Sequence, residues 1–105
     1  MTTRVSLSIA CIVLALVSLP MILGKVPPNS TYGFRTRLTL SSPDIWYPAN
    51  TFSGWALLIA AGICLVTLWL LPETLLVRPL VPVAAFLVPV SLSLVASLIY
   101  LRRFG

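Results

Sequence analysis

The sequence predicts an all-α membrane protein with three transmembrane helices and an ordered loop between helices 1 and 2. Of its 105 residues, 59% are hydrophobic and only 9% are charged, whereas a soluble domain carries about a quarter charged residues. Three apolar stretches without a charge each have about the 20 residues needed to cross a hydrocarbon core. Because lipid offers the backbone no hydrogen-bond partners, we expect three helices in a single membrane domain, residues 1–105.

The first expected span covers about 5–24, between Arg4 and Lys25. A cleaved signal peptide is the alternative interpretation of this stretch. Its apolar run is long for the core of a signal peptide, and no pair of small residues marks a cleavage site after Ser18. We therefore expect it to be retained as an anchor.

The loop, residues 25–51, mixes turn-forming residues with large aromatic side chains. An idle linker would be rich in glycine, serine and charge, so this composition predicts a loop that packs. Pro27, Pro28 and Asn29 predict a turn or polyproline exit from the first helix.

From Phe34 to Leu40 the side chains alternate, which places Arg35 and Arg37 on one side of an extended segment. Both guanidinium groups are expected to face phosphates or a carboxylate. Asp44 is the leading partner for Arg35, in competition with helix carbonyls and lipid phosphate.

A short helix over about 43–50 is expected to lead into the second span, about 52–71. Ser42 can cap it, Pro43 suits the first helical position, and Asp44 complements the N-terminal dipole. Pro48 is expected to bend or break it, so that an interfacial segment turns into the membrane-crossing one. Trp46 on this helix is expected to insert its ring at the membrane boundary while its N–H finds an acceptor.

The third span is expected over about 79–101, between Arg78 and the pair Arg102-Arg103, with a kink at Pro89. Stripes of small residues should bring the three helices together. The serines among them are either helix contacts or a polar pathway, and we favour helix contacts. Cys11 and Cys64 are expected at similar depth, either as two small apolar core residues or as a buried disulfide.

Lysine and arginine asymmetry predicts the orientation. The loop and the C-terminus share a side that holds five basic residues, against two on the other side, so this side should be cytoplasmic and the N-terminus outside. Trp69 is expected to be a passive anchor at the outer interface. The excess positive charge is better explained by lipid headgroups than by nucleic acid, which we do not expect as a partner.

The loop resembles the SdpI family, named after a bacterial membrane protein that gives immunity to a secreted toxic peptide. The resemblance is carried by Pro27-Pro28-Asn29, Tyr32-Gly33-Phe34-Arg35-Thr36, Thr39-Leu40-Ser41, Trp46 and Asn50 up to Gly54. It implies a three-helix unit of the bacterial inner membrane, with the motif joining two of the helices. Pro48 departs from the family pattern, and we expect the chain to lack the preceding transmembrane half of the longer immunity proteins. The binding residues that the resemblance implies are Pro28, Asn29, Gly33, Arg35, Thr36, Trp46 and Asn50.

Composition argues against catalysis and ion-coupled transport. Histidine is absent, and the two carboxylates, Asp44 and Glu73, are expected on opposite sides of the membrane. No ionisable residue lies within a span, where coupling would need one. Two cysteines without histidine make an incomplete metal site, and no cofactor is expected.

Binding therefore remains as the expected function. One hypothesis is an immunity or signalling protein that recognises a toxic, membrane-active peptide or a cytoplasmic partner through the 25–51 loop. The alternative is a small accessory subunit of a larger membrane complex, with the loop as its docking surface. The expected partners are the lipid bilayer, such a peptide or another membrane protein, and association with a second copy stays open.

Overall fold

The computed structural model describes residues 3–29 and 31–104. These residues form the α-helices α1 (Thr3–Ile22), α2 (Pro43–Leu70), α3 (Glu73–Leu76) and α4 (Leu80–Leu101), with 3₁₀ turns η1 (Thr39–Ser41) and η2 (Arg102–Phe104). The helices α1, α2 and α4 are each long and apolar enough to cross a membrane. The all-α fold with three membrane-spanning helices is therefore confirmed.

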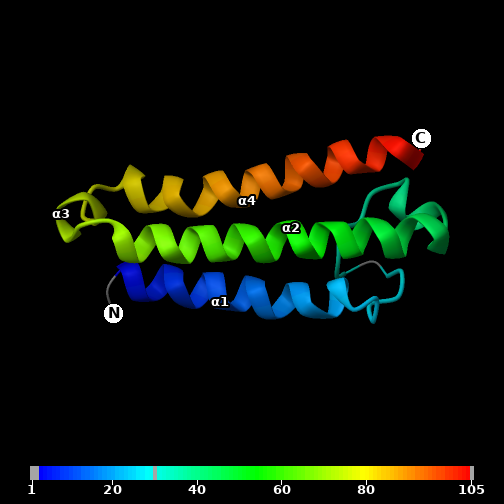
Figure 1. Ribbon diagram of the computed structural model, residues 1–105, viewed down its shortest axis with the longest axis horizontal. Helices are drawn as coiled ribbons and strands as arrows, with labels where there is room; N and C mark the ends of the chain where they lie inside the picture. Colours follow the sequence, from blue (N-terminus) through cyan, green and yellow to red (C-terminus); the bar gives the residue numbers. More distant parts are fainter. Residues whose placement is uncertain (1–2, 30, 105) are drawn as a thin grey trace.

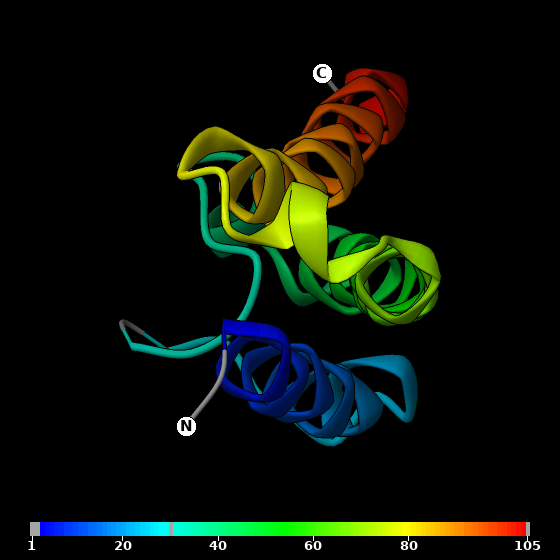
Figure 2. The same ribbon diagram turned by 90° about the vertical axis from the view of Figure 1, so that its left-hand side faces the viewer.

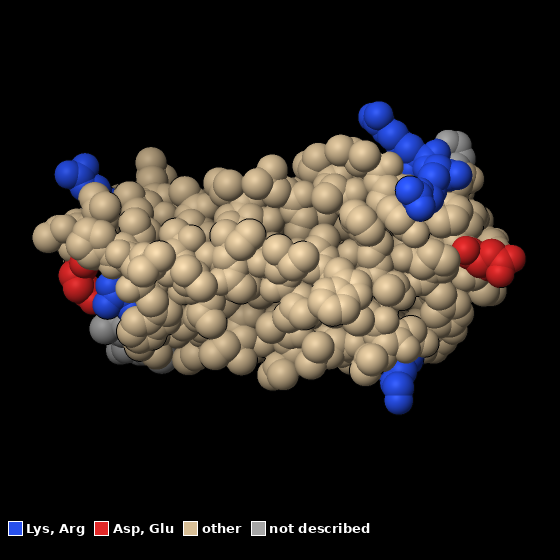
Figure 3. Space-filling view, viewed as in Figure 1, with Lys and Arg blue, Asp and Glu red and all other residues tan. Residues whose placement is uncertain are grey.

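The three long helices lie side by side, and α2 packs against both α1 and α4 (Figures 1 and 2). The short helix α3 and the start of α1 lie at one end of the molecule, whereas the α1–α2 loop and the end of α4 lie at the other (Figure 1). We call the latter the loop end. In Figure 3 the charged side chains gather at the two ends and leave an uncharged band between them, as expected for a protein that spans a bilayer.

Helix α2 is continuous from Pro43 to Leu70, so the expected short segment 43–50 and the expected second span form one helix. As predicted from sequence, the Ser42 hydroxyl caps this helix by accepting from the Asp44 amide. Pro48 does not break the helix. It removes one backbone hydrogen bond, but the residues on either side of it, described below, are held by burial and side-chain hydrogen bonds.

Helices α1 and α2 approach closely at Gly54, where a Cβ atom would lie 2.9 Å from Cγ1 of Ile22 and 3.0 Å from the Ser18 carbonyl oxygen. Small side chains fill much of the remaining contact, because close backbone approach is what holds helices together in lipid. The small residues buried along α1 are Ser8, Cys11 and Ser18, and those along α2 include Ala60, Ala61 and Cys64.

Helix α4 is the most exposed of the three, and it buries only Pro82, Ser97 and Leu101. It continues through Pro89. Near the loop end it contacts α2 through stacked rings of Phe52 and Tyr100, whose centroids are 4.3 Å apart. Its last turn is therefore tied to the part of α2 that carries the loop.

Candidate functional site

The α1–α2 loop folds back over the beginning of α2 and is fastened there by buried side chains. An apolar cluster brings the loop, α1, α2 and the end of α4 together around Met21, Phe34, Ala49 and Leu101. The loop contributes Val26, Tyr32 and Leu38 to the rim of this cluster, next to Ile45 and Phe104. The loop is thus part of the core at this end of the molecule. We call residues 25–51 the loop platform.

Asn29 builds the first turn of the loop platform. Its side-chain oxygen accepts hydrogen bonds from the amides of Thr31 (2.8 Å) and Tyr32 (2.6 Å), and its amide group donates to the Pro27 carbonyl (2.8 Å). Asparagine suits this role because its side chain can mimic a backbone turn.

Tyr32 then ties the loop back to the first helix, since its hydroxyl donates to the Val17 carbonyl. Burial raises the pKa of the Tyr32 hydroxyl above its ordinary value.

Trp46 lies inside the protein and not at the membrane boundary, so the expectation for its ring was wrong. Its side chain is 0% exposed, and its indole N–H donates to the Val26 carbonyl at 2.7 Å. The ring lies below Gly33, where an added Cβ would meet Trp46 carbon atoms at 3.2 and 3.3 Å. The sequence signal was correct in one respect: a tryptophan on a capped first turn does need an acceptor. The loop itself supplies it.

Asn50, one turn further along α2, holds the loop backbone at Phe34. Its side-chain oxygen accepts from the Phe34 amide (2.7 Å), and its NH₂ group donates to the carbonyls of Phe34 (3.3 Å) and Trp46 (3.0 Å). Asn50 is 2% exposed, and a buried amide side chain of this kind must have its polar atoms paired. One side chain therefore satisfies both backbone groups of a buried loop residue.

Gly33 allows Asn50 to reach the loop backbone, because glycine has no Cβ atom to block it. Its φ of +105° lies where side chains are disfavoured, and a Cβ atom there would lie 2.7 Å from the Asn50 side-chain oxygen. Gly33, Trp46 and Asn50 thus form one interlocked unit.

Thr36 and Thr39 close the second half of the loop. The Thr39 hydroxyl, on a fully buried residue, accepts from the Thr36 amide (2.7 Å) and donates to the Thr36 carbonyl (3.1 Å). The Thr36 hydroxyl accepts from the Thr39 amide at 3.1 Å. Thr39 was not among the expected binding residues, although its place in the family motif was a signal.

The remaining motif residues face outward. Pro28 and Arg35 are exposed, as are Lys25 and Arg37 on the same loop. The expected pairing of Arg35 with Asp44 stays a prediction. At the end of α4, the Arg103 guanidinium lies 4.5 Å from the centroid of the Tyr100 ring. The loop end thus has a buried framework and a basic exterior.

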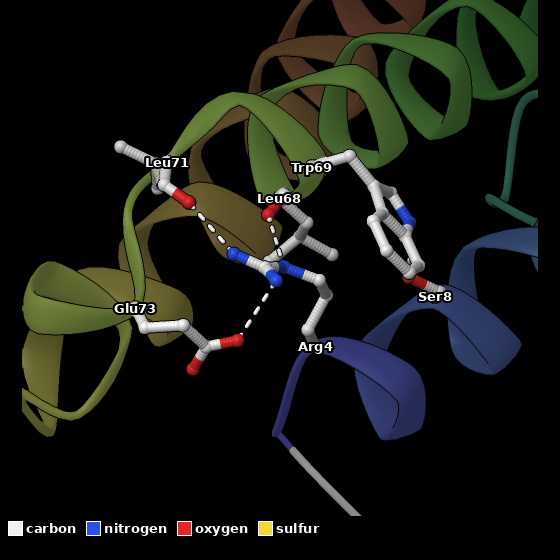
Figure 4. Close-up of polar contacts among 6 residues, drawn as sticks. All are labelled: Arg4, Ser8, Leu68, Trp69, Leu71 and Glu73. Atoms are coloured by element: carbon white, nitrogen blue, oxygen red, sulfur yellow. Dashed lines mark hydrogen bonds and ion pairs between the residues drawn. The ribbon is translucent and has the colours of Figure 1, made fainter.

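At the opposite end, Arg4 joins α1 to the end of α2, which the sequence interpretation missed (Figure 4). Its guanidinium donates to the carbonyls of Leu68 (3.0 Å) and Leu71 (2.8 Å) and pairs with Glu73 at 2.8 Å. A cation is favourable there because the last carbonyls of a helix carry partial negative charge. An arginine opening one apolar stretch and a glutamate closing another were the available signals.

Trp69 belongs to the same cluster, so it is more than the passive anchor that we expected. Its indole N–H donates to the Ser8 hydroxyl at 3.0 Å, and the Arg4 guanidinium lies 5.2 Å from its ring centroid. Trp69 is 57% exposed, yet its side chain connects α2 to α1 (Figure 4).

Comparison with known proteins agrees with the motif in the loop. The family model described as the SdpI/YfhL protein family matches residues 25–100, from the beginning of the loop platform almost to the end of α4. No match was found among curated proteins, and none among solved structures.

Proposed function

This chain belongs to the SdpI/YfhL protein family, and on that premise we propose that it is a non-enzymatic, immunity-type membrane protein that binds a membrane-active peptide at the loop platform. The observation that carries the proposal is the construction of the loop. Trp46 and Asn50 are buried and hydrogen-bond to the loop backbone at Val26 and Phe34. The loop that connects α1 to α2 is therefore held in a fixed arrangement. Binding sites benefit from such preorganisation, because less ordering is needed when the ligand arrives.

The motif residues divide into two roles under this proposal. Asn29, Gly33, Thr36, Trp46 and Asn50 form the framework. The contact surface is the exposed exterior, where Arg35 and Arg37 lie on the same loop as Leu40, which is 47% exposed, and where Tyr47 in the first turns of α2 is 36% exposed. Cationic and apolar groups together suit a peptide that presents apolar side chains and a carboxylate at a membrane surface.

We further propose that the loop platform and the C-terminus face the cytoplasm of a bacterial inner membrane and that the N-terminus faces outward. The loop end holds Lys25 with the pairs Arg35, Arg37 and Arg102, Arg103, whereas the other end holds Arg4 and Arg78. Short loops rich in lysine and arginine stay on the cytoplasmic side. A peptide that has inserted into the bilayer would meet the platform at the inner surface.

A survival experiment tests the proposal. Bacteria that produce the chain are challenged with a toxic membrane-active peptide, and the peptide concentration that stops growth is measured. Production of the unaltered chain should raise this concentration. The double variant Arg35→Gln, Arg37→Gln should lose the protection, whereas Arg78→Gln, an exposed arginine at the other end, should keep it. Full protection by the double variant would contradict the proposed contact surface.

The alternative, an accessory subunit of a membrane complex, is favoured by the exposed length of α4, which buries three of its residues. It predicts that another membrane protein purifies with the chain in mild detergent at a fixed ratio. The sequence interpretation placed the docking surface of such a subunit on the loop, whereas the exposed length of α4 favours docking through α4. If α4 is the docking surface, the association should survive Arg35→Gln, Arg37→Gln, and its loss in this variant would return the docking surface to the loop.

A further inference from the structure

The two cysteines of the chain, Cys11 in α1 and Cys64 in α2, meet inside the bundle. Their exposed fractions are 1% and 0%, and their sulfur atoms are 2.9 Å apart, with the Cys11 thiol donating to the Cys64 sulfur. Both are free thiols. The two cysteines are 53 residues apart in the sequence. In the structure they share an apolar cluster with Leu68 and Leu76. The sequence left two hypotheses open, two small core residues or a disulfide. The structure places the two sulfur atoms in the contact that formation of a disulfide requires.

Both thiols lie at the same depth. Cys11 comes about 12 Å along α1 from its start and Cys64 about 9 Å before the end of α2, at 1.5 Å per residue. A charged oxidant would have to leave water to reach them, which is costly in an apolar region. A hollow of about 170 Å³ on the α1–α2 surface is lined by Cys11 together with Ala15, Ala61 and Gly62, and a small uncharged oxidant fits such a volume.

We propose that Cys11 and Cys64 are a covalent modification site, oxidised by hydrogen peroxide to a disulfide that joins α1 to α2. One thiol gives up its proton and attacks a peroxide oxygen as the thiolate, the O–O bond breaks, and the proton joins the leaving hydroxide, so that a sulfenic acid and one water form. The second thiol then displaces the sulfenic hydroxyl, which leaves with its proton as a second water. Two thiols and one peroxide therefore give one disulfide and two waters. Proximity favours the second step, because the partner sulfur is already in contact.

The disulfide would fix the position of α1 relative to α2, and the loop platform is hydrogen-bonded to α1. The Val17 and Met21 carbonyls of α1 accept hydrogen bonds from Tyr32 and Thr51, so a shift of α1 along α2 would disturb the loop anchors. The oxidised protein should therefore resist separation of α1 from α2, and reduction should remove that resistance.

Intact mass spectrometry tests the site. The chain in membrane vesicles is reduced, freed of reductant, treated with hydrogen peroxide, and unfolded in excess maleimide. The proposal predicts a product two hydrogen atoms lighter than the reduced chain and without maleimide adducts, which gains two adducts after renewed reduction. Two adducts without prior reduction, or a product carrying added oxygen atoms on both cysteines, would overturn it.

A relocated cysteine provides the matched control. In Cys11→Ser, Ile12→Cys the thiol moves by one residue onto a side chain that is 49% exposed on the bundle surface. This variant should take two adducts after the same peroxide treatment, since its thiol no longer faces Cys64. Equal cross-linking in both proteins would show that mobility, and not the contact described here, brings the sulfur atoms together, and would also overturn the proposal.

Discussion

At the scale of single residues, the loop motif is explained by backbone requirements. Asn50 pairs both backbone groups of Phe34, Trp46 supplies the surface below Gly33, and Gly33 has the backbone conformation that lets the two meet. None of these residues needs a ligand to account for its chemistry. From the sequence, the family motif singled out Gly33, Trp46 and Asn50, and the structure shows that they contact one another. The sequence could not predict which way Trp46 points. A tryptophan whose indole N–H has a hydrogen-bond acceptor suits a membrane interface and a buried site equally well.

Gly33→Ala should destabilise the protein by about 2–4 kcal/mol. Roughly 1–2 kcal/mol comes from placing a side chain at positive φ, and overpacking against the Asn50 oxygen contributes about as much again. Thermal unfolding in detergent measures the effect. Gly24→Ala is the matched control, because its φ is +69° but an added Cβ meets no atom within 4 Å. It should lose only the backbone contribution of about 1–2 kcal/mol. Equal losses in the two variants would show that the contact with Asn50 is unimportant.

At the scale of secondary-structure elements, α2 organises the molecule. It begins at a capped turn predicted from Ser42, Pro43 and Asp44. At its C-terminal end, Arg4 caps the helix by donating hydrogen bonds to the Leu68 and Leu71 carbonyls. Sequence reasoning placed a bend or break at Pro48, since a proline removes a helix hydrogen bond at a cost of about 3 kcal/mol. The helix persists because Trp46 and Asn50, on either side of Pro48, are hydrogen-bonded to the loop at Val26 and Phe34. Tertiary contacts outweigh local propensity here.

Arg4→Gln should destabilise the α1–α2 pair by roughly 1–3 kcal/mol, because the Leu68 and Leu71 carbonyls lose their charged donor. Glu73→Gln should cost less, about 0–1 kcal/mol, since Glu73 is 67% exposed and its ion pair is screened by solvent. Unfolding in detergent distinguishes the two, with exposed Arg78→Gln as the reference for loss of charge alone. A larger loss for Glu73→Gln than for Arg4→Gln would contradict the assignment of Arg4 as a helix cap.

At the scale of the whole molecule, the number of membrane-spanning helices, their apolar character and their order followed from composition and from the three uncharged stretches. The closeness of Cys11 and Cys64 did not, because helical spacing gives the depth of a residue in the bilayer but not the rotation of its helix. The role of Arg4 was hidden for the same reason. Its partners come from the far end of α2, and only the packing of α1 against α2 brings them together.

The orientation of the whole molecule is testable by labelling. In a background of Cys11→Ala and Cys64→Ala, Ser41→Cys on the loop platform should resist an impermeant maleimide in intact cells and react after lysis. Thr74→Cys on α3, at the opposite end, should react in both conditions. The basic loop end is expected inside because of its excess of lysine and arginine. The reverse labelling pattern would show that the loop platform faces outward.

The central claim is that α2 holds the loop as a folded platform, and amide hydrogen exchange at Phe34 tests it most directly. The Phe34 N–H is buried against Asn50, so in the bilayer-embedded protein it should exchange slowly, and Asn50→Ala should accelerate its exchange by about tenfold or more, as local opening becomes easier. Amides in the middle of α4 should be unaffected by the same substitution. Rapid exchange of the Phe34 amide in the unaltered protein, or exchange that Asn50→Ala leaves unchanged, would mean that the loop is not held by α2.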